Sequence, residues 1–433
     1  MKLSFAKHGL APLFFVSLAC ALLSTGCSGA PGAPAAQGAT TRTTTAISVA
    51  TVDSVSVDAG LGADAGPPLE GVVHMSVGSG GTTCALLTGG GVDCWGYNLW
   101  GSLGNGGSVQ ETNSALTPEP VVGLTDATAL SAGDNTICAL ISGGSVRCWG
   151  LGADGELGNG KSSNSSKPVT VSGLTDATAI AGGGELECAI VSGGAVMCWG
   201  VNVNGALGIG TTTGPDGCES GEACASTPVE VSGLTGATSI SVGGEFACAV
   251  VAGGSVNCWG VNTYGQLGNG TTTNSSTPVE VSGLTGARLV SCSESSACAL
   301  IKGDTVECWG YNEQGQLGNG THVSSSTPVE VVDLTDAHHV SVGHVSACAV
   351  HSSGAVKCWG SNAVGELGNG RTNNSSKPSS VVGITDAVAV SVGYGNACAR
   401  LSGGTMQCWG GNGAGELGNG TTESSSTPTT VVQ

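Results

Sequence analysis

The sequence predicts an all-β fold, a seven-bladed β-propeller of four-stranded blades, on three observations. The triplet Cys-Trp-Gly occurs seven times, with its tryptophan at intervals of 54, 50, 60, 50, 50 and 50 residues. Around each triplet, short β-branched runs alternate with Gly-Gly and Asn-Gly pairs, which accept the positive φ angles of hairpin turns. Glycine is abundant, with 76 of 433 residues, and aromatic residues make up only 4%, so a helical core is disfavoured.

The first 27 residues are expected to form an export signal. An uncharged apolar run over residues 10–23 is too short to span a membrane as a helix, and small residues then lead to Cys27. The segment Leu23-Ser-Thr-Gly-Cys27 resembles the lipobox of bacterial lipoproteins, although its leucine stands four rather than three residues before the cysteine. The resemblance implies lipidation of Cys27 and, because Ser28 follows, the outer membrane or cell surface. Cys20 is a second candidate, and an ordinary cleaved signal leading to a soluble periplasmic or secreted protein is the alternative.

Residues 28–70 are rich in Ala, Gly, Pro, Ser and Thr and contain no aromatic residue. Such a composition cannot bury enough apolar surface to fold, so we expect a flexible tether there. The repeats, and with them the propeller, are expected to occupy residues 71–433.

Each copy of the repeat contains four predicted strands. In the fourth copy they are residues 238–242, 247–251, 255–259 and 278–281. A four-stranded unit of about 50 residues is the size of one propeller blade, and seven blades lie within the usual range. A β-solenoid is the alternative, but its coils are usually shorter and its terminal repeats are atypical caps, which neither the first nor the last copy resembles.

After each tryptophan the chain follows the pattern Trp-Gly-x-Asn-x-x-Gly-Gln/Glu-Leu-Gly-Asn-Gly, best preserved at residues 259–270, 309–320 and 359–370. On these residues the region 71–433 resembles the regulator of chromosome condensation repeat family, which implies a seven-bladed propeller. The family includes exchange factors for small GTPases, a plant ultraviolet photoreceptor and a secreted bacterial inhibitor of β-lactamase. The resemblance therefore specifies the fold and leaves the function open.

Fourteen of the 19 cysteines form seven pairs with a spacing of ten residues. The two members flank the turn between the second and third strands, where facing Cα atoms lie about 4.5–5.5 Å apart, a separation that suits a disulfide. In an exported protein we expect intrablade disulfides, with buried thiols or zinc sites as the alternatives. The pairs are Cys84–Cys94, Cys138–Cys148, Cys188–Cys198, Cys248–Cys258, Cys298–Cys308, Cys348–Cys358 and Cys398–Cys408. Cys218 and Cys224 are expected to staple a ten-residue insertion in the third copy, and Cys292 to fill the core as an unpaired residue.

The sequence contains no phosphate loop, nucleophile elbow or His-containing metal spacing, so we expect no enzymatic activity, no cofactor and no metal. Only 12 Lys and Arg residues oppose 31 Asp and Glu, giving a formal net charge of −19. Neutralising phosphates requires clustered basic residues, so nucleic-acid binding is disfavoured.

Positions that differ between copies gather in two places, between the first and second strands and after the Cys-Trp-Gly triplet. In an up-and-down blade both connections emerge on the same face, so we expect one acidic face with aromatic anchors, the residue types that dominate binding hot spots. Neutral surface loops are the alternative. The candidate binding residues are Tyr97, Trp100, Asp134, Glu185, Glu245, Phe246, Tyr264, Glu294, Tyr311, Glu313, His344 and Tyr394.

These observations favour a monomeric, non-catalytic propeller at the cell envelope that binds a protein or a carbohydrate and meets the membrane only through its lipid anchor. A guanine-nucleotide exchange factor for a GTPase is the first alternative, which export disfavours. A propeller hydrolase or lyase is the second, and it would need paired carboxylates or a histidine near the central channel.

Overall fold

The structure is a computed structural model that describes residues 66–110 and 113–433. The predicted export signal, the predicted lipidation site Cys27 and residues 28–65 lie outside the described residues. In the described part of the chain, no helix is long and apolar enough to cross a membrane.

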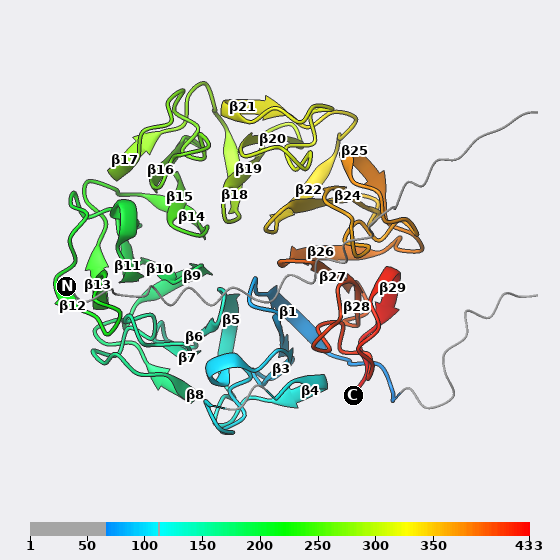
Figure 1. Ribbon diagram of the computed structural model, residues 1–433, viewed down its shortest axis with the longest axis horizontal. Coiled ribbons are helices and arrows are strands. Elements are labelled where there is room, and N and C mark those ends of the chain that lie inside the picture. The colour runs from blue at the N-terminus through cyan, green and yellow to red at the C-terminus, as the bar shows by residue number, and fades with distance from the viewer. Residues whose placement is uncertain (1–65, 111–112) are drawn as a thin grey trace, which may run out of the picture. The chain divides into compact units, whose positions relative to one another are not determined.

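The described residues form seven antiparallel sheets arranged radially around a central axis, as Figure 1 shows. In six of them, four strands pair in chain order, so each blade is an up-and-down meander whose first strand is innermost. The third blade has a fifth strand at its outer edge, which the insertion contributes. The seven-bladed, all-β propeller predicted from the repeats is therefore confirmed.

The strands of blades 1 to 3 are β1 (Val72–Val77), β2 (Thr82–Leu87), β3 (Val92–Gly96), β4 (Ala115–Pro120), β5 (Ala127–Ala132), β6 (Thr136–Ile141), β7 (Val146–Gly150), β8 (Ser165–Thr170), β9 (Ala177–Gly183), β10 (Leu186–Val191), β11 (Val196–Val201), β12 (Asp216–Gly217) and β13 (Ala223–Glu230). Those of blades 4 to 7 are β14 (Ala237–Val242), β15 (Phe246–Val251), β16 (Val256–Gly260), β17 (Ser275–Glu280), β18 (Ala287–Cys292), β19 (Ser296–Ile301), β20 (Thr305–Gly310), β21 (Ser325–Glu330), β22 (Ala337–Val342), β23 (Ser346–His351), β24 (Val356–Gly360), β25 (Ser375–Ser380), β26 (Ala387–Val392), β27 (Asn396–Leu401), β28 (Met406–Gly410) and β29 (Ser425–Thr430). In the fourth blade the predicted ends agree with these bounds to within one residue, except that β17 begins earlier than predicted.

Polarity within a blade follows the burial of each strand. The second strand is buried on both faces and is almost wholly apolar, as in β15, where five of the six residues are buried. The outermost strand has no buried residue in β17 and is rich in Ser and Thr. Because the second strand is covered on both faces by neighbouring blades, its sequence is a continuous apolar run rather than a strict alternation.

The tryptophan of each Cys-Trp-Gly triplet fastens its blade to the preceding one. All seven indoles are fully buried, and each Nε1 donates a hydrogen bond to a backbone oxygen of the neighbouring blade. Trp309, for example, donates to the carbonyl oxygen of Gln266 at 2.8 Å. Gly268 faces the same ring so closely that a Cβ there would lie 2.9 Å from it. The repeated motif therefore builds the junction between blades.

A second contact between blades runs around the central axis. The hydroxyl oxygen of Ser241 accepts a hydrogen bond from the backbone N–H of Cys292 in the next blade at 2.9 Å. Equivalent serine contacts occur at four more junctions. One of them joins Ser391 of the last blade to Val77 of the first, at 3.0 Å. The innermost strands are thus linked across the point where the chain closes on itself.

The ring closes without exchange of a strand, because blade 7 consists entirely of β26 to β29. Instead, the backbone N–H of Leu69 donates to the carbonyl oxygen of Val431, and that of Gln433 donates to Pro67, at 2.9 and 2.8 Å. The Leu69 side chain is completely buried. The folded unit therefore begins a few residues before residue 71, because the closing segment is held by the far end of the chain. The repeat comparison placed the start at residue 71, since this segment carries no repeat pattern of its own.

The seven cysteine pairs are disulfides in the structure, each between facing residues of the second and third strands. Cys298 and Cys308 are direct partners in the strand register, and their Cα atoms lie 4.0 Å apart. Cys218 and Cys224 are also bonded to each other within the insertion. Cys292 is a buried free thiol at the end of β18, a position that other blades fill with a small apolar residue.

Candidate binding face

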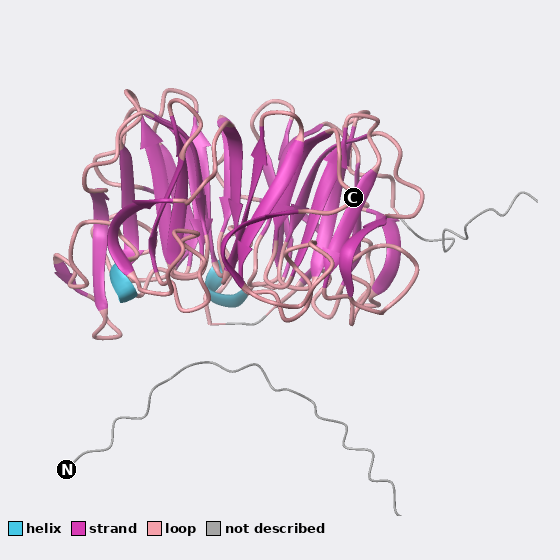
Figure 2. Ribbon diagram, turned by 90° about the horizontal axis from the view of Figure 1, so that it is seen from above, coloured by secondary structure: helices cyan, strands magenta, loops and turns pink. Residues whose placement is uncertain are grey.

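The connections within a blade emerge alternately on the two faces of the propeller. On one face, the turn between the second and third strands bonds to the connection between blades, as where Gly254 accepts a hydrogen bond from Ala287 at 2.9 Å. The other face, called the loop face below, carries the connections between the first and second strands and between the third and fourth. Its loops include the short 3-10 helices η1 (Leu99–Gly101) and η2 (Val203–Gly205), which lie at the same edge in Figure 2. Both variable sets of loops therefore share one face.

A groove of about 490 Å³ lies on the loop face over blades 4 to 6. Tyr264 and Tyr311 line it with their rings edge to face, the centroids 4.9 Å apart and the planes at 60°. Tyr264 is 47% exposed. Edge-to-face pairing fixes the orientation of aromatic rings, so this pair presents an ordered apolar surface to solvent.

Acidic side chains border the two tyrosines. Glu245 and Glu294 line the groove, and both are exposed. The Tyr311 hydroxyl donates to Glu313 at 2.8 Å, which raises the pKa of the phenol because only its protonated form can make this bond. His344 pairs with Glu294 and holds the pKa of that carboxyl below its usual value. His344 is the only basic side chain among the described residues of the groove lining.

The aromatic surface continues into blade 7. The ring of Tyr394 stacks on His344, with the centroids 4.5 Å apart and the planes at 22°. Tyr394 is 58% exposed. His344 therefore joins two parts of the loop face, since it bonds to Glu294 on one side and supports an exposed aromatic ring on the other.

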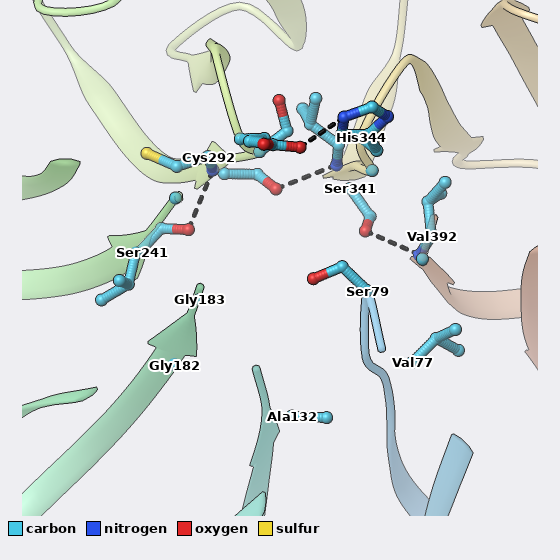
Figure 3. Close-up of a pocket in the computed structure, with 18 of the residues that line it drawn as sticks. Val77, Ser79, Ala132, Gly182, Gly183, Ser241, Cys292, Ser341, His344 and Val392 are labelled. Atoms are coloured by element: carbon cyan, nitrogen blue, oxygen red, sulfur yellow. Dashed lines mark hydrogen bonds and ion pairs between the residues drawn. The ribbon is translucent and has the colours of Figure 1, made fainter. Parts of the chain in front are cut away.

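A smaller cavity of about 210 Å³ surrounds the central axis, where the first strands of the blades meet (Figure 3). Glycine, serine and small apolar residues make up most of its wall. Ser79 donates a hydrogen bond to Asp134 there, and burial raises the pKa of that carboxyl. Cys292 also lines the cavity, but burial raises the pKa of its thiol to about 12. The cysteine is therefore protonated at neutral pH and is a poor nucleophile.

A separate group of acidic residues lies at the junction of blades 2 and 3, also among the connections of the loop face. Carboxylate oxygens of Asp154, Glu156 and Glu185 lie within 4.8 Å of one another. Glu156 and the nearby Glu187 are buried, which raises the pKa of Glu156 to about 8 and raises that of Glu187 well above its usual value. Comparison of the repeats missed Glu156, because it occupies the Gln/Glu position of the motif common to most copies.

The structure brings together some of the predicted binding residues and separates others. Glu245, Tyr264, Glu294, Tyr311 and His344 line the groove, and Glu313 and Tyr394 contact its lining residues. Tyr97 and Trp100 in blade 1, Asp134 in blade 2 and Glu185 in blade 3 are not part of this lining. Gln266 and Gln314, which were not among the predicted residues, also line it.

The prediction for Phe246 was wrong. Its side chain is completely buried, because it is the first residue of β15 and packs inward against Gly243 and Gly260. The variable loop of this blade ends one residue earlier, at the exposed Glu245. Phe246 therefore belongs to the core and cannot contact a partner directly.

Comparisons with known proteins agree with this architecture. The family model of the RCC1-like domain matches residues 52–399, and that of the regulator of chromosome condensation (RCC1) repeat matches residues 387–416. Human WBSCR16 is 19% identical, with a TM-score of 0.70 over 80% of this chain and 94% of that one. Yeast RCC1 (Prp20), solved bound to Kap60, is 19% identical, with a TM-score of 0.67 over 79% and 83% of the two chains. Prp20p from Saccharomyces cerevisiae, in a second structure, is 18% identical, with a TM-score of 0.67 over 80% and 87%. At these identities the structural similarity establishes a common fold.

Proposed function

Since the chain belongs to the RCC1-like domain family, whose model spans most of its length, we propose that it is a non-catalytic binding propeller that takes a protein partner on the loop face. The observation that carries this proposal is the groove over blades 4 to 6. It combines an ordered pair of partly exposed tyrosines with carboxylates at its border. Aromatic residues that are solvent-accessible in the free protein and become buried in a complex supply much of the energy of protein interfaces.

Precedents within the fold support a protein rather than a carbohydrate as the partner. Yeast RCC1 (Prp20) is bound to Kap60, and Prp20p has been characterised for binding to Gsp1p and to histones. We place the partner of this chain outside the inner membrane, on the grounds of the predicted export signal and the lipobox-like segment. That setting argues against a cytosolic GTPase as the partner.

The charge of the groove defines the chemistry of the partner. Glu245, Glu294 and Glu313 face the same region as the two tyrosines, and only His344 provides a basic group in the lining. A partner segment that carries Lys or Arg beside an apolar side chain would pair with the carboxylates while its apolar part packs on the rings. Because such ion pairs are screened by salt, binding should weaken as ionic strength rises.

The test is affinity capture from cell-envelope extract with the full chain, comparing wild type with the double variant Tyr264→Ala/Tyr311→Ala by quantitative mass spectrometry. Each truncation should cost about 2 kcal/mol of binding, about 30-fold in affinity, if the rings become buried in the complex. Both side chains are solvent-accessible, so the free energy of unfolding should change by no more than about 0.5 kcal/mol per site.

A matched control alters the opposite face. Thr175→Ala and Thr335→Ala lie in connections between blades, on the rim that carries the turns between the second and third strands, and should leave capture unchanged. A partner captured equally well by the folded double tyrosine variant, but lost with these rim variants, would show that binding uses the other face.

A further inference from the structure

We propose that the acidic group at the junction of blades 2 and 3 is a binding site for one divalent cation of the calcium class, with Asp154, Glu156 and Glu185 as ligands. The site is distinct from the tyrosine groove, and the inference does not depend on the proposed partner. Asp154 and Glu156 come from the connection between β7 and β8, and Glu185 from the connection between β9 and β10. A bound ion would therefore join two blades.

The spacing of the ligand atoms suits calcium. One carboxylate oxygen from each of the three residues lies within 4.8 Å of the other two. Calcium binds oxygen ligands at about 2.3–2.6 Å, so two ligands on opposite sides of one ion lie up to about 5 Å apart. Zinc prefers nitrogen and sulfur ligands, which this group does not contain.

A second observation points to a missing positive group. Glu156 is completely buried, and its Oε2 accepts a hydrogen bond from the backbone N–H of Asp154 at 2.8 Å. Its Oε1 is also buried but has no hydrogen-bond partner. A buried carboxylate oxygen without a partner is costly, and a cation held by the three carboxylates would satisfy it.

Blade 6 shows how the same motif position is satisfied when no ion is needed. Glu366 occupies the position of Glu156, and its Oε2 accepts the same kind of hydrogen bond, from Val364 at 2.9 Å. Its Oε1 accepts a further hydrogen bond from the hydroxyl of Ser361 at 3.2 Å. Blade 2 carries Leu151 at the position of Ser361, so Glu156 lacks this donor.

Glu187 adds a further buried carboxyl group beside this site. It is 1% exposed, and its Oε1 also lacks a hydrogen-bond partner. The equivalent residue in blade 4 is Ala247. Space for the carboxylate comes from Gly182, where blade 4 has Val242, since a Cβ at Gly182 would lie 2.3 Å from a Glu187 oxygen. The larger side chain of Glu187 thus occupies the space that the absence of a side chain at Gly182 leaves.

Within the described residues, none of the four carboxylates of Asp154, Glu156, Glu185 and Glu187 takes part in an ion pair with Lys, Arg or His.

The insertion of blade 3 contacts one side of the group, where Asp154 Oδ1 accepts a hydrogen bond from the backbone N–H of Ser220 at 3.0 Å. A cation here would compensate the negative charge and fasten the insertion to both blades.

The experiment measures calcium binding by the full chain after removal of metal with EDTA, by calorimetry and by terbium luminescence. Trp199 donates its indole N–H to the backbone oxygen of Glu156 at 2.8 Å, so it is placed to sensitise a terbium ion at this site. We expect calcium to bind with a Kd of about 10⁻⁴ to 10⁻³ M, more tightly than magnesium, and to displace terbium. Glu156→Gln and Glu185→Gln should each weaken calcium binding by at least about tenfold.

Glu366→Gln is the control, because it changes the same motif position in a blade without the acidic group, and it should bind calcium as wild type does. Glu185 is exposed, so its variant tests the ligand role even if Glu156→Gln fails to fold. Absence of calcium binding up to about 10 mM, well above that range, would overturn the proposal. So would unchanged binding in folded Glu156→Gln and Glu185→Gln, because the ion would then lie elsewhere.

Discussion

At the scale of single residues, the repeated glycines and tryptophans act as pairs across the junctions between blades. Gly268 has a φ of +65° and stands against the Trp309 ring, whereas Gly283 has a φ of +75° and no atom within 4 Å of the Cβ position. Both glycines adopt a conformation that disfavours other residues, but only Gly268 is also confined by a neighbour. Alanine substitutions at the two positions therefore distinguish the cost of backbone strain from the cost of a steric clash with the indole.

We predict that Gly283→Ala lowers the free energy of unfolding by about 1–2 kcal/mol, the cost of placing alanine in the left-handed region. Gly268→Ala should lower it by a further 1–3 kcal/mol, roughly, because the methyl group displaces the buried indole. Denaturant unfolding followed by circular dichroism measures both. Equal losses in the two variants would mean that the indole shifts at no cost and that close contact is not why the motif needs this glycine.

At the scale of elements, each blade is built around the disulfide-bonded hairpin of its second and third strands. The facing cysteines are direct register partners, and the third strand adds the tryptophan that reaches the neighbouring blade. The crosslink therefore holds the strand pair that presents the junction residue. The adjacent cysteine and tryptophan of each copy thus place the crosslink beside the junction residue.

We predict that Cys298→Ala/Cys308→Ala lowers the free energy of unfolding by about 2–3 kcal/mol, as expected for opening a loop of this length. Cys292→Val should stay within about 1.5 kcal/mol of wild type, because it replaces a buried thiol with the residue that Val242 provides in blade 4. Thermal and denaturant unfolding measure both changes, and non-reducing peptide mapping should recover Cys298 linked to Cys308. Free thiols at that pair in native protein would refute the disulfide.

At the scale of the whole propeller, stability depends on closing the ring between the first and last blades. The contacts across this junction include three kinds: Trp95 donates to Glu416 at 2.9 Å, Ser391 accepts from Val77, and the segment around Leu69 pairs with the end of the chain. The first two repeat contacts found between other blades. The third replaces a covalent connection, so it is the one that truncation can remove.

We predict that a chain beginning at residue 66 unfolds at the same temperature as the full chain, whereas one beginning at residue 71 is less stable. The shorter chain loses the buried Leu69 side chain, a cost of about 2–3 kcal/mol, and the backbone hydrogen bonds to Val431 and Gln433. Differential scanning calorimetry of the two chains makes the comparison. Equal midpoints would show that the serine and tryptophan contacts close the ring without this segment.

The sequence by itself determined the blades, because everything that defines a blade lies within about fifty consecutive residues and is repeated seven times. Strand bounds in the fourth copy, the facing cysteines and the single face shared by the variable loops all follow from local patterns and meander geometry. Family membership follows from the same motif. These features can be predicted without knowing which blades are neighbours.

Only the tertiary structure decided which of the variable residues act together. Tyr264 and Tyr311 come from different blades, as do Glu156 and Glu187, and Leu69 is buried by the opposite end of the chain. Phe246 was assigned to the variable loop because the sequence does not show where β15 begins. Burial changes from exposed at Glu245 to complete at Phe246, the first residue of that strand. Contacts between blades depend on the separation and orientation of neighbouring sheets, which closure of the ring sets and which no single repeat encodes.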